Sequence, residues 1–270
     1  MRGLFSGGVI DAMMERGIRY DGIIGVSAGA AFGCNYKSRQ QGRPLRYNQQ
    51  MAHEWRYCSV RSWLTTGDLF GGDFCYHVLP RDIDPFDVQA YDANPTAFYA
   101  VCTDVDTGEA VYQPLPKADD SCYEWIRASA SMPICSRIVH IGGRKLLDGG
   151  VADSIPLEYF QRAGYRRNVV VLTQPLGYRK QPNHLLPLIR CVYRRHPEFV
   201  QSVAHRHEMY NAQLDYVAHE EQAGRALVIR PPQALPIGHV SHDPDEMQRV
   251  YDIGRQTAEA MMDEIVRFLG

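Results

Sequence analysis

The feature that most constrains the fold is residues 25–29, Gly-Val-Ser-Ala-Gly, which separate two different residue patterns. The short apolar run at residues 23–24 is typical of a buried strand, and residues 28–36 are mostly small, which suits a buried helix. A strand, a sharp turn and a helix are therefore predicted around Ser27. Such a turn would hold the Ser27 hydroxyl clear of its neighbours, above the end of a sheet.

Ser27 is the first candidate for chemistry, because a serine hydroxyl becomes a nucleophile when it is held apart and given a base. The tight turn requires small flanking residues, which would explain Gly25 and Gly29. The helix that begins at Ala28 would point its N-terminal amides and the positive end of its dipole towards developing negative charge. The pattern itself is short and also arises by chance in loops, so the flanking strand and helix carry the prediction.

The position of this turn separates two hydrolase architectures. In the α/β-hydrolase fold the nucleophile turn follows several strands. Only 26 residues precede Ser27 here, enough for one helix and one strand, so that fold is disfavoured.

The rest of the chain alternates helices and strands, which predicts an α/β fold with a mainly parallel central sheet flanked by helices. Two hairpins are expected, with turns at residues 106–108 and at residues 142–143, where two glycines accept the positive φ angles of a tight turn. Asp243 as N-cap, followed by Pro244 and Glu246, marks the start of a final helix. The predicted helices are residues 6–15, 28–36, 47–57, 156–164, 198–222 and 243–269, and the predicted strands are residues 23–24, 97–102, 110–113, 137–141, 144–147, 168–173 and 226–229.

Composition argues against several classes of protein. Lysine and arginine number 29 against 31 aspartates and glutamates, a net charge of −2, whereas nucleic-acid-binding domains are usually basic. No uncharged apolar run approaches the roughly 18 residues that span a bilayer, and Asp11 and Glu15 come too early for a signal peptide. The seven cysteines are scattered without a Cys-x-x-Cys pair, which favours reduced thiols over disulfides or a zinc site. A cytoplasmic globular protein that does not bind nucleic acid is expected.

Several motifs, in this order along the chain, resemble those of the patatin-like phospholipases. Residues 1–9 resemble the end of that family's glycine-rich oxyanion loop and the helix after it, and residues 25–29 resemble its nucleophile turn. Residues 128–133 resemble the segment ahead of the second active-site region, and residues 148–156 resemble the family's aspartate motif. The resemblance covers about residues 1–175, and the chain is similar to bacterial serine acyl hydrolases of this family.

The resemblance implies a patatin-like three-layer sandwich, with a catalytic domain at residues 1–175 and a helical C-terminal extension, residues 176–270, packed on the same domain. The family's first core strand would precede Met1, so this strand is expected to be missing from the sheet. The resemblance also implies a Ser-Asp dyad that needs no metal or other cofactor. The implied site residues are Ser27 and Asp148 as the catalytic pair, Arg2, Gly3, Gly25, Ala28 and Gly29 at the oxyanion loop and nucleophile turn, and Gly149 and Gly150 in the aspartate motif.

Asp148 suits the role of base for reasons independent of the resemblance. It stands at the end of a predicted strand, and the two glycines after it allow another backbone to approach closely. Alone, it would be interpreted as a turn aspartate that closes a hairpin. Its pairing with Ser27 in this chain order favours the base, whereas Asp153 is expected to be an ordinary loop or capping residue.

Three interpretations of the function stay open. The leading one is an acyl hydrolase that cleaves lipid or other acyl esters through an acyl-enzyme intermediate. The second is a catalytically impaired relative that binds lipid or a protein partner. The third is a Ser-His-Asp esterase of another fold, although no histidine stands in an evident motif with Asp148.

Two further segments have alternative interpretations. The apolar residues of segment 55–70 would line or cover an acyl channel, or belong to ordinary core packing; they are Trp55, Trp63, Leu64, Leu69 and Phe70. The basic stretch 190–207, which includes Arg206, is expected to be a solvated helix surface. Peripheral contact of this stretch with anionic lipid head groups is the alternative.

Overall fold

The central strand of the main sheet is β2, residues Ala97–Asp104, in the computed structural model, which describes all 270 residues. The other strands are β1 (Gly22–Val26), β3 (Ala110–Pro114), β4 (Val139–Ile141), β5 (Arg144–Asp148), β6 (Asn168–Val171) and β7 (Ala226–Ile229). β2 pairs in parallel with β1 and antiparallel with β3 and β5, and β4 extends the sheet beyond β5. β6 and β7 form a separate parallel pair.

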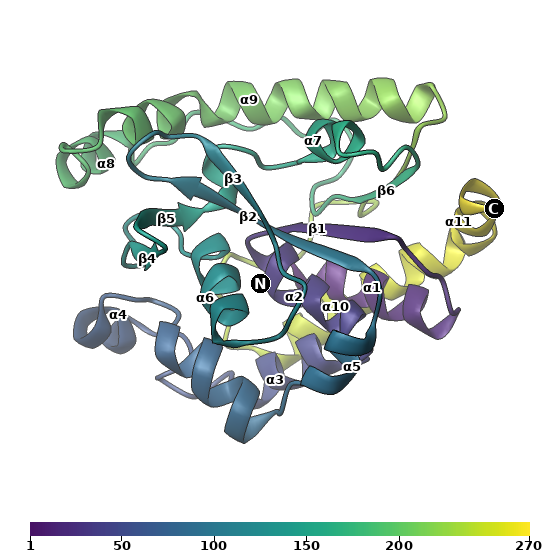
Figure 1. Cartoon of the computed structure of the whole chain (residues 1–270), viewed down its shortest axis with the longest axis horizontal. Coiled ribbons are helices and arrows are strands. Elements are labelled where there is room, and N and C mark those ends of the chain that lie inside the picture. The colour runs from purple at the N-terminus through teal and green to yellow at the C-terminus, as the bar shows by residue number, and fades with distance from the viewer.

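The prediction of a mainly parallel sheet is wrong, because three of the four pairings in the main sheet are antiparallel. Both predicted hairpins formed, as β2–β3 and β4–β5, and strands joined by a tight turn must run in opposite directions. β5 then pairs back onto β2, which adds a third antiparallel contact. The α/β class itself is confirmed, with a mixed sheet flanked by helices (Figure 1).

Each of the six predicted helices has a counterpart in the structure, which also contains four α-helices and a π-helix that were not predicted. The helices are α1 (Leu4–Glu15), α2 (Ala28–Lys37), α3 (Arg43–Gln50), α4 (Val60–Thr66), α5 (Val88–Ala93), α6 (Asp120–Ser129), α7 (Leu157–Arg162), α8 (Leu186–Val192), α9 (Pro197–Gln222), α10 (Pro244–Ala260) and α11 (Met262–Leu269), with a π-helix η1 (Phe74–Ile83) and a 3₁₀ turn η2 (Gly149–Val151). The helix expected at residues 47–57 is instead α3, which starts earlier because Gly42 has φ 69° and Pro44 fits the first turn. The final helix is divided into α10 and α11 at Met261.

Two neighbouring leucines of β5 show the layers of the sandwich. Leu146 packs in a buried cluster with residues of α2 and α6, whereas Leu147 packs in another cluster with residues of α8 and α9. Successive side chains of a strand point to opposite faces of a sheet. Helices therefore cover both faces, in agreement with the three-layer arrangement.

The two ends of the chain share one core. Side chains of α1 and α10 pack in a single buried cluster, and the two helices approach so closely that a Cβ on Gly8 would lie 2.1 Å from the Tyr251 carbonyl oxygen. A Cβ on Gly254 would lie 2.0 Å from the Phe5 carbonyl oxygen. The C-terminal helices are thus part of the hydrophobic core around α1, while a domain boundary at residue 175 stays a prediction.

Candidate active site

Ser27 occupies the turn between β1 and α2, with φ 56° and ψ −123°. A positive φ at a residue other than glycine costs roughly 1–3 kcal/mol, and such strain is concentrated at functional sites. Gly25 is required by close packing, because a Cβ there would lie 2.5 Å from the Gly29 carbonyl oxygen. The same explanation is wrong for Gly29, where a Cβ would meet no atom within 4 Å.

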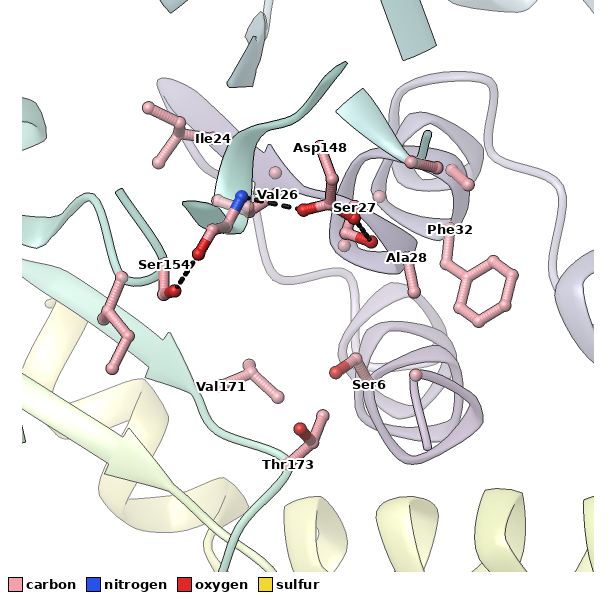
Figure 2. Close-up of a pocket in the computed structure, with 18 of the residues that line it drawn as sticks. Ser6, Ile24, Val26, Ser27, Ala28, Phe32, Asp148, Ser154, Val171 and Thr173 are labelled. Carbon is pink, nitrogen blue, oxygen red and sulfur yellow. Dashed lines mark hydrogen bonds between the residues drawn. The ribbon is translucent and has the colours of Figure 1, made fainter. Parts of the chain in front are cut away.

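Asp148 ends β5 and accepts a hydrogen bond from the Ser27 hydroxyl, with 2.6 Å between Oγ and Oδ2 (Figure 2). The strand register explains how residues 121 positions apart meet. β1 and β5 lie along the same edge of β2, since β3 overlaps both of them and takes the other edge. Val26 stands opposite Val101, and Asp148 stands opposite the next residue, Cys102. The carboxyl ends of β1 and β5 therefore meet head to head.

The second carboxylate oxygen of Asp148 is also held. Oδ1 accepts a hydrogen bond from the Gly150 N–H at 2.8 Å, and the Gly150 carbonyl oxygen accepts one from the Ser154 hydroxyl at 2.6 Å (Figure 2). A Cβ on Gly149 would lie 2.1 Å from the Val101 carbonyl oxygen, so glycine permits the close backbone approach that the sequence predicted. The carboxylate is fixed in position before any substrate arrives.

Ser129, at the end of α6, is a neighbour of Ser27 whose contact the sequence analysis missed. Its hydroxyl oxygen accepts a hydrogen bond from the Ser27 backbone N–H at 3.0 Å, and its side chain is fully buried. Two residues later, the Ser131 carbonyl oxygen accepts a hydrogen bond from the Asp148 N–H at 2.8 Å. The end of α6 thus holds both Ser27 and Asp148, although a single serine at a helix end carries no sequence signal for this contact.

Burial raises the pKa of the Asp148 carboxyl above its ordinary value. The hydrogen bond from Ser27, the charge of Arg206 and the Gly150 N–H act in the opposite direction, because each stabilises the carboxylate. The net shift is upwards, since only 5% of the residue is exposed. A carboxylate in this environment is a stronger base than one in water.

Arg206 of α9 is placed differently from the prediction. It was expected on a solvated basic surface, but it is half-buried and its Nε–H donates a hydrogen bond to the Gly150 carbonyl oxygen at 2.5 Å. The sequence did contain a signal, because Phe199, Val203 and Arg206 recur at helical spacing, and the first two are buried. Arg206 therefore lies on the inner face of α9.

The oxyanion candidates gather at the start of α2. A Cβ on Gly3 would lie 2.6 Å from the Ala28 Cβ, so the start of α1 packs directly on the residue after Ser27. The Ala28 N–H makes no hydrogen bond to protein atoms. Arg2 donates a hydrogen bond to Nε2 of His239 at 2.5 Å. An oxyanion-binding role for these residues stays a prediction.

No histidine forms a hydrogen bond with Ser27 or Asp148 in the structure; the Ser27 hydroxyl donates to Asp148. Asp153, the other carboxylate of this segment, accepts hydrogen bonds from Tyr112 and Gln213, at 2.6 Å each. It links β3 to α9 and does not contact Ser27. Its environment agrees with the expected structural role.

Ser27 and Asp148 line a cavity of about 1690 Å³. From segment 55–70, Leu69 and Phe70 line this cavity, whereas Trp55, Trp63 and Leu64 do not and are exposed at 38%, 40% and 75%. The acyl-channel interpretation therefore applies to part of this segment only.

No group of three or more histidine, cysteine, aspartate or glutamate side chains is arranged to hold a metal ion, and all seven cysteines are unpaired. None of the helices combines the length and the apolar composition needed to cross a membrane.

Comparison with known proteins matches two segments of the chain to family models. Residues 1–160 match the sequence model of the patatin-like phospholipases, and residues 196–270 match a domain of unknown function, DUF6363. The protein YjjU of Escherichia coli K12, which carries the name "Uncharacterized protein", is 27% identical over 184 residues, covering 64% of this chain and 49% of that protein.

The fungal relatives are much longer proteins. Lysophospholipase nte1 of Aspergillus niger is 27% identical over 179 residues, and lysophospholipase NTE1 of Candida glabrata is 28% identical over 167 residues. These alignments cover 60% and 58% of this chain, but only 10% and 9% of the fungal proteins. This chain thus spans about half the length of the bacterial relative and about a tenth of the fungal ones. Since the family match extends over more than half of its residues, the chain belongs to the patatin-like phospholipase family.

Proposed function

We propose that this protein is a serine acyl hydrolase that cleaves lipid or other acyl esters with Ser27 as nucleophile and Asp148 as base. The observation that carries the proposal is the 2.6 Å hydrogen bond from the Ser27 hydroxyl to the buried Asp148 carboxylate, at the wall of a large cavity. A nucleophile within hydrogen-bond reach of its base is the geometry that such chemistry requires.

The reaction runs in two steps. Ser27 Oγ attacks the ester carbonyl carbon while Asp148 accepts the hydroxyl proton, and the proton then passes to the departing alcohol as the acyl-enzyme forms. In the second step Asp148 takes a proton from a water molecule, whose oxygen bonds to the acyl carbon. The bond between this carbon and Ser27 Oγ then breaks, Asp148 returns the proton to Ser27 Oγ, and the carboxylic acid leaves. The strained turn at Ser27 and the paired oxygens of Asp148 keep both groups in place through the two steps.

Negative charge develops on the carbonyl oxygen during each attack. The unpaired N–H of Ala28, at the positive end of the α2 dipole, is the donor that the turn offers to this oxygen. Gly3 packs against Ala28, so the start of α1 lies beside the same point.

An acyl ester with an apolar chain fits the character of the cavity. Ile24, Val26, Phe32 and Val171 lie around the dyad in Figure 2, and all four line the cavity. The lysophospholipase names of the fungal relatives agree with an acyl ester substrate.

The direct test is turnover of short p-nitrophenyl esters by Ser27→Ala and Asp148→Asn. Each variant is expected to lose at least about 10³-fold in kcat while staying folded. Ser6→Ala and Asp21→Asn are matched controls, because both residues line the same cavity and neither forms a hydrogen bond with Ser27 or Asp148. Both controls should retain activity.

A serine-reactive fluorophosphonate provides a second readout. It should label the wild type at Ser27 and fail to label Ser27→Ala. Full turnover by both dyad variants would refute the proposal. A folded wild type that binds lipid but neither turns over nor reacts with the probe would instead favour the binding role.

A further inference from the structure

The cavity of Ser27 and Asp148 is strongly positive. Eight arginine and lysine residues line it, against two aspartates, in a chain with a net charge of −2. Among these cations, Arg179 pairs with Asp215, but Arg2, Lys180 and Arg206 form no ion pair with a carboxylate. The uncompensated charge is therefore a feature of this cavity and not of the whole surface.

These three cations are close to one another and to the dyad. Arg206 bonds the Gly150 carbonyl oxygen, and its guanidinium nitrogen lies 2.9 Å from the place where a Cβ of Gly150 would stand. Arg2 directly precedes Gly3, which packs on Ala28. The pKa of Lys180 falls to about 8, through its burial and through the charges of Arg206 and Arg2. Like charges are held together here at an energetic cost that an anion would relieve.

The positions of these side chains are set before a ligand binds. The Lys180 backbone exchanges two hydrogen bonds with the Asn211 side chain, at 2.8 and 3.1 Å. Its ammonium nitrogen stands 5.3 Å from the centre of the Tyr210 ring. Arg2 is oriented by its hydrogen bond to His239, which accepts at Nε2 because a guanidinium can only donate.

We propose that Arg2, Lys180 and Arg206 bind the phosphate of the substrate, and that the substrate is an acylglycerol phosphate, an acyl ester whose phosphate is a monoester. The inference rests on the proposed acyl hydrolase function and names its substrate class. Arginine and lysine are the side chains that bind phosphate oxygens best, through charge-assisted hydrogen bonds. The glycerol unit separates ester and phosphate by a few bonds, which suits the placement of Arg206 beside the segment that follows Asp148.

A net anionic head group fits this site better than a zwitterionic one. The cavity contains only two carboxylates; Asp148 belongs to the dyad and Asp21 stands at the opposite end of β1. Neither is available to balance a quaternary ammonium next to Lys180. Two of the three cations come from residues beyond the family match at 1–160, and Arg206 lies in the segment of unknown function, 196–270.

The test compares kcat/KM for an octanoyl glycerol phosphate with that for octanoyl glycerol, from the fatty acid released. The wild type should prefer the phosphate ester, and Lys180→Met should lower this preference by about 10- to 100-fold, the worth of a hydrogen bond between charged groups. Lys180 is a cleaner choice than Arg206, which also holds the backbone beside Asp148. Lys180→Gln serves if the methionine variant does not fold. Lys117→Met is the control, because Lys117 is exposed and pairs with Asp92 at 3.5 Å, outside the cavity.

The pH dependence gives an independent readout. The wild-type KM for the phosphate ester should rise as the pH passes about 8, where Lys180 loses its proton, and Lys180→Met should lack this rise. The groups that face the Lys180 ammonium are the guanidinium groups of Arg2 and Arg206, the imidazole of His239 and the aromatic ring of Tyr210.

Each outcome decides the inference. Equal turnover of the two octanoyl esters by the wild type, or an unchanged preference in Lys180→Met, would overturn it and leave the hydrolase function standing.

If the wild type cleaves no ester at all, the proposed function fails, and calorimetric titration with glycerol 3-phosphate tests the subsite alone. Binding weakened by Lys180→Met would support it; absent or unchanged binding would overturn it. Inorganic phosphate that binds as tightly as glycerol 3-phosphate would indicate a free-phosphate site and overturn the lipid assignment.

Discussion

The crossing of α1 and α10 allows a sharp test, because two adjacent glycines of α1 have opposite surroundings. A Cβ on Gly7 would make ordinary contact, 3.5 Å from the Pro44 Cβ. A Cβ on Gly8 would lie 2.1 Å from the Tyr251 carbonyl oxygen and 2.9 Å from the Arg255 nitrogen, both backbone atoms. The substitutions Gly7→Ala and Gly8→Ala make the same chemical change, one residue apart.

Each substitution gains about 0.8–1.0 kcal/mol of helix propensity. At Gly7 no steric clash opposes this gain, so the free energy of unfolding should rise by up to about 1 kcal/mol. For Gly8, a carbon–oxygen contact needs about 3.3 Å, so α1 and α10 must separate by roughly 1 Å. Overpacking of this kind costs about 1–3 kcal/mol or more, and backbone atoms cannot rotate away. The net expectation for Gly8→Ala is a loss of about 2 kcal/mol.

Urea unfolding followed by circular dichroism measures both free energies, and thermal unfolding should show Gly8→Ala about 4–8 °C below the wild type. Gly7→Ala controls for the effect of alanine in this helix. Equal stabilisation by the two substitutions would show that α1 and α10 do not cross at backbone contact, and would refute the packing of the C-terminal helices described here.

Two further predictions concern the site. Ser129→Ala should lower kcat by about tenfold with little change in KM, because the Ser27 N–H loses the acceptor that holds the turn. Steady-state kinetics on p-nitrophenyl butyrate measure both constants. An unchanged kcat would argue against a positioning role for Ser129. The ascending limb of the kcat/KM profile, which requires the Asp148 carboxylate, should lie above the ordinary aspartate value of 3.8. Arg206→Gln removes a positive charge that lowers this pKa, so the limb should move to higher pH; a shift to lower pH would contradict the assigned contact.

The sequence predicted local structure well where one pattern decides it. The apolar run before residue 25 and the small residues after Ser27 correctly indicated β1 and α2, and the glycine pair at 142–143 correctly indicated a hairpin. Sheet topology depends on which distant strands pair, and the alternation of helices and strands does not encode this. The return of β5 onto β2, which made the sheet mixed, is such a pairing.

The same distinction between local patterns and distant contacts applies to the residues of the candidate site. Ser27 and Asp148 were singled out from their motifs, and their contact follows from the register of β1 and β5 on β2. Ser129 belongs to the motif at residues 128–133, but its contact with the Ser27 backbone N–H was not predicted, because a hydrogen bond to a backbone group does not depend on the type of residue that donates it. Arg206 could have been found by extending the apolar stripe of α9, but its basic neighbours suggested a solvated surface.

The position of Arg206 changes how the C-terminal segment should be understood. A segment that only covered the core could vary at α9 without affecting the chemistry at Ser27. Arg206 instead donates a hydrogen bond to the carbonyl oxygen of Gly150, and the N–H of Gly150 donates one to the Asp148 carboxylate. Only Gly150 therefore stands between the C-terminal segment and this carboxylate. Because α10 packs on α1 and the start of α1 packs on Ala28, the same segment also supports the other side of the turn. The two matched segments, 1–160 and 196–270, therefore meet as one structural unit at the site. A substitution of Arg206 that leaves the fold intact should still change the pH dependence of turnover, because the charge of Arg206 acts on the Asp148 carboxyl.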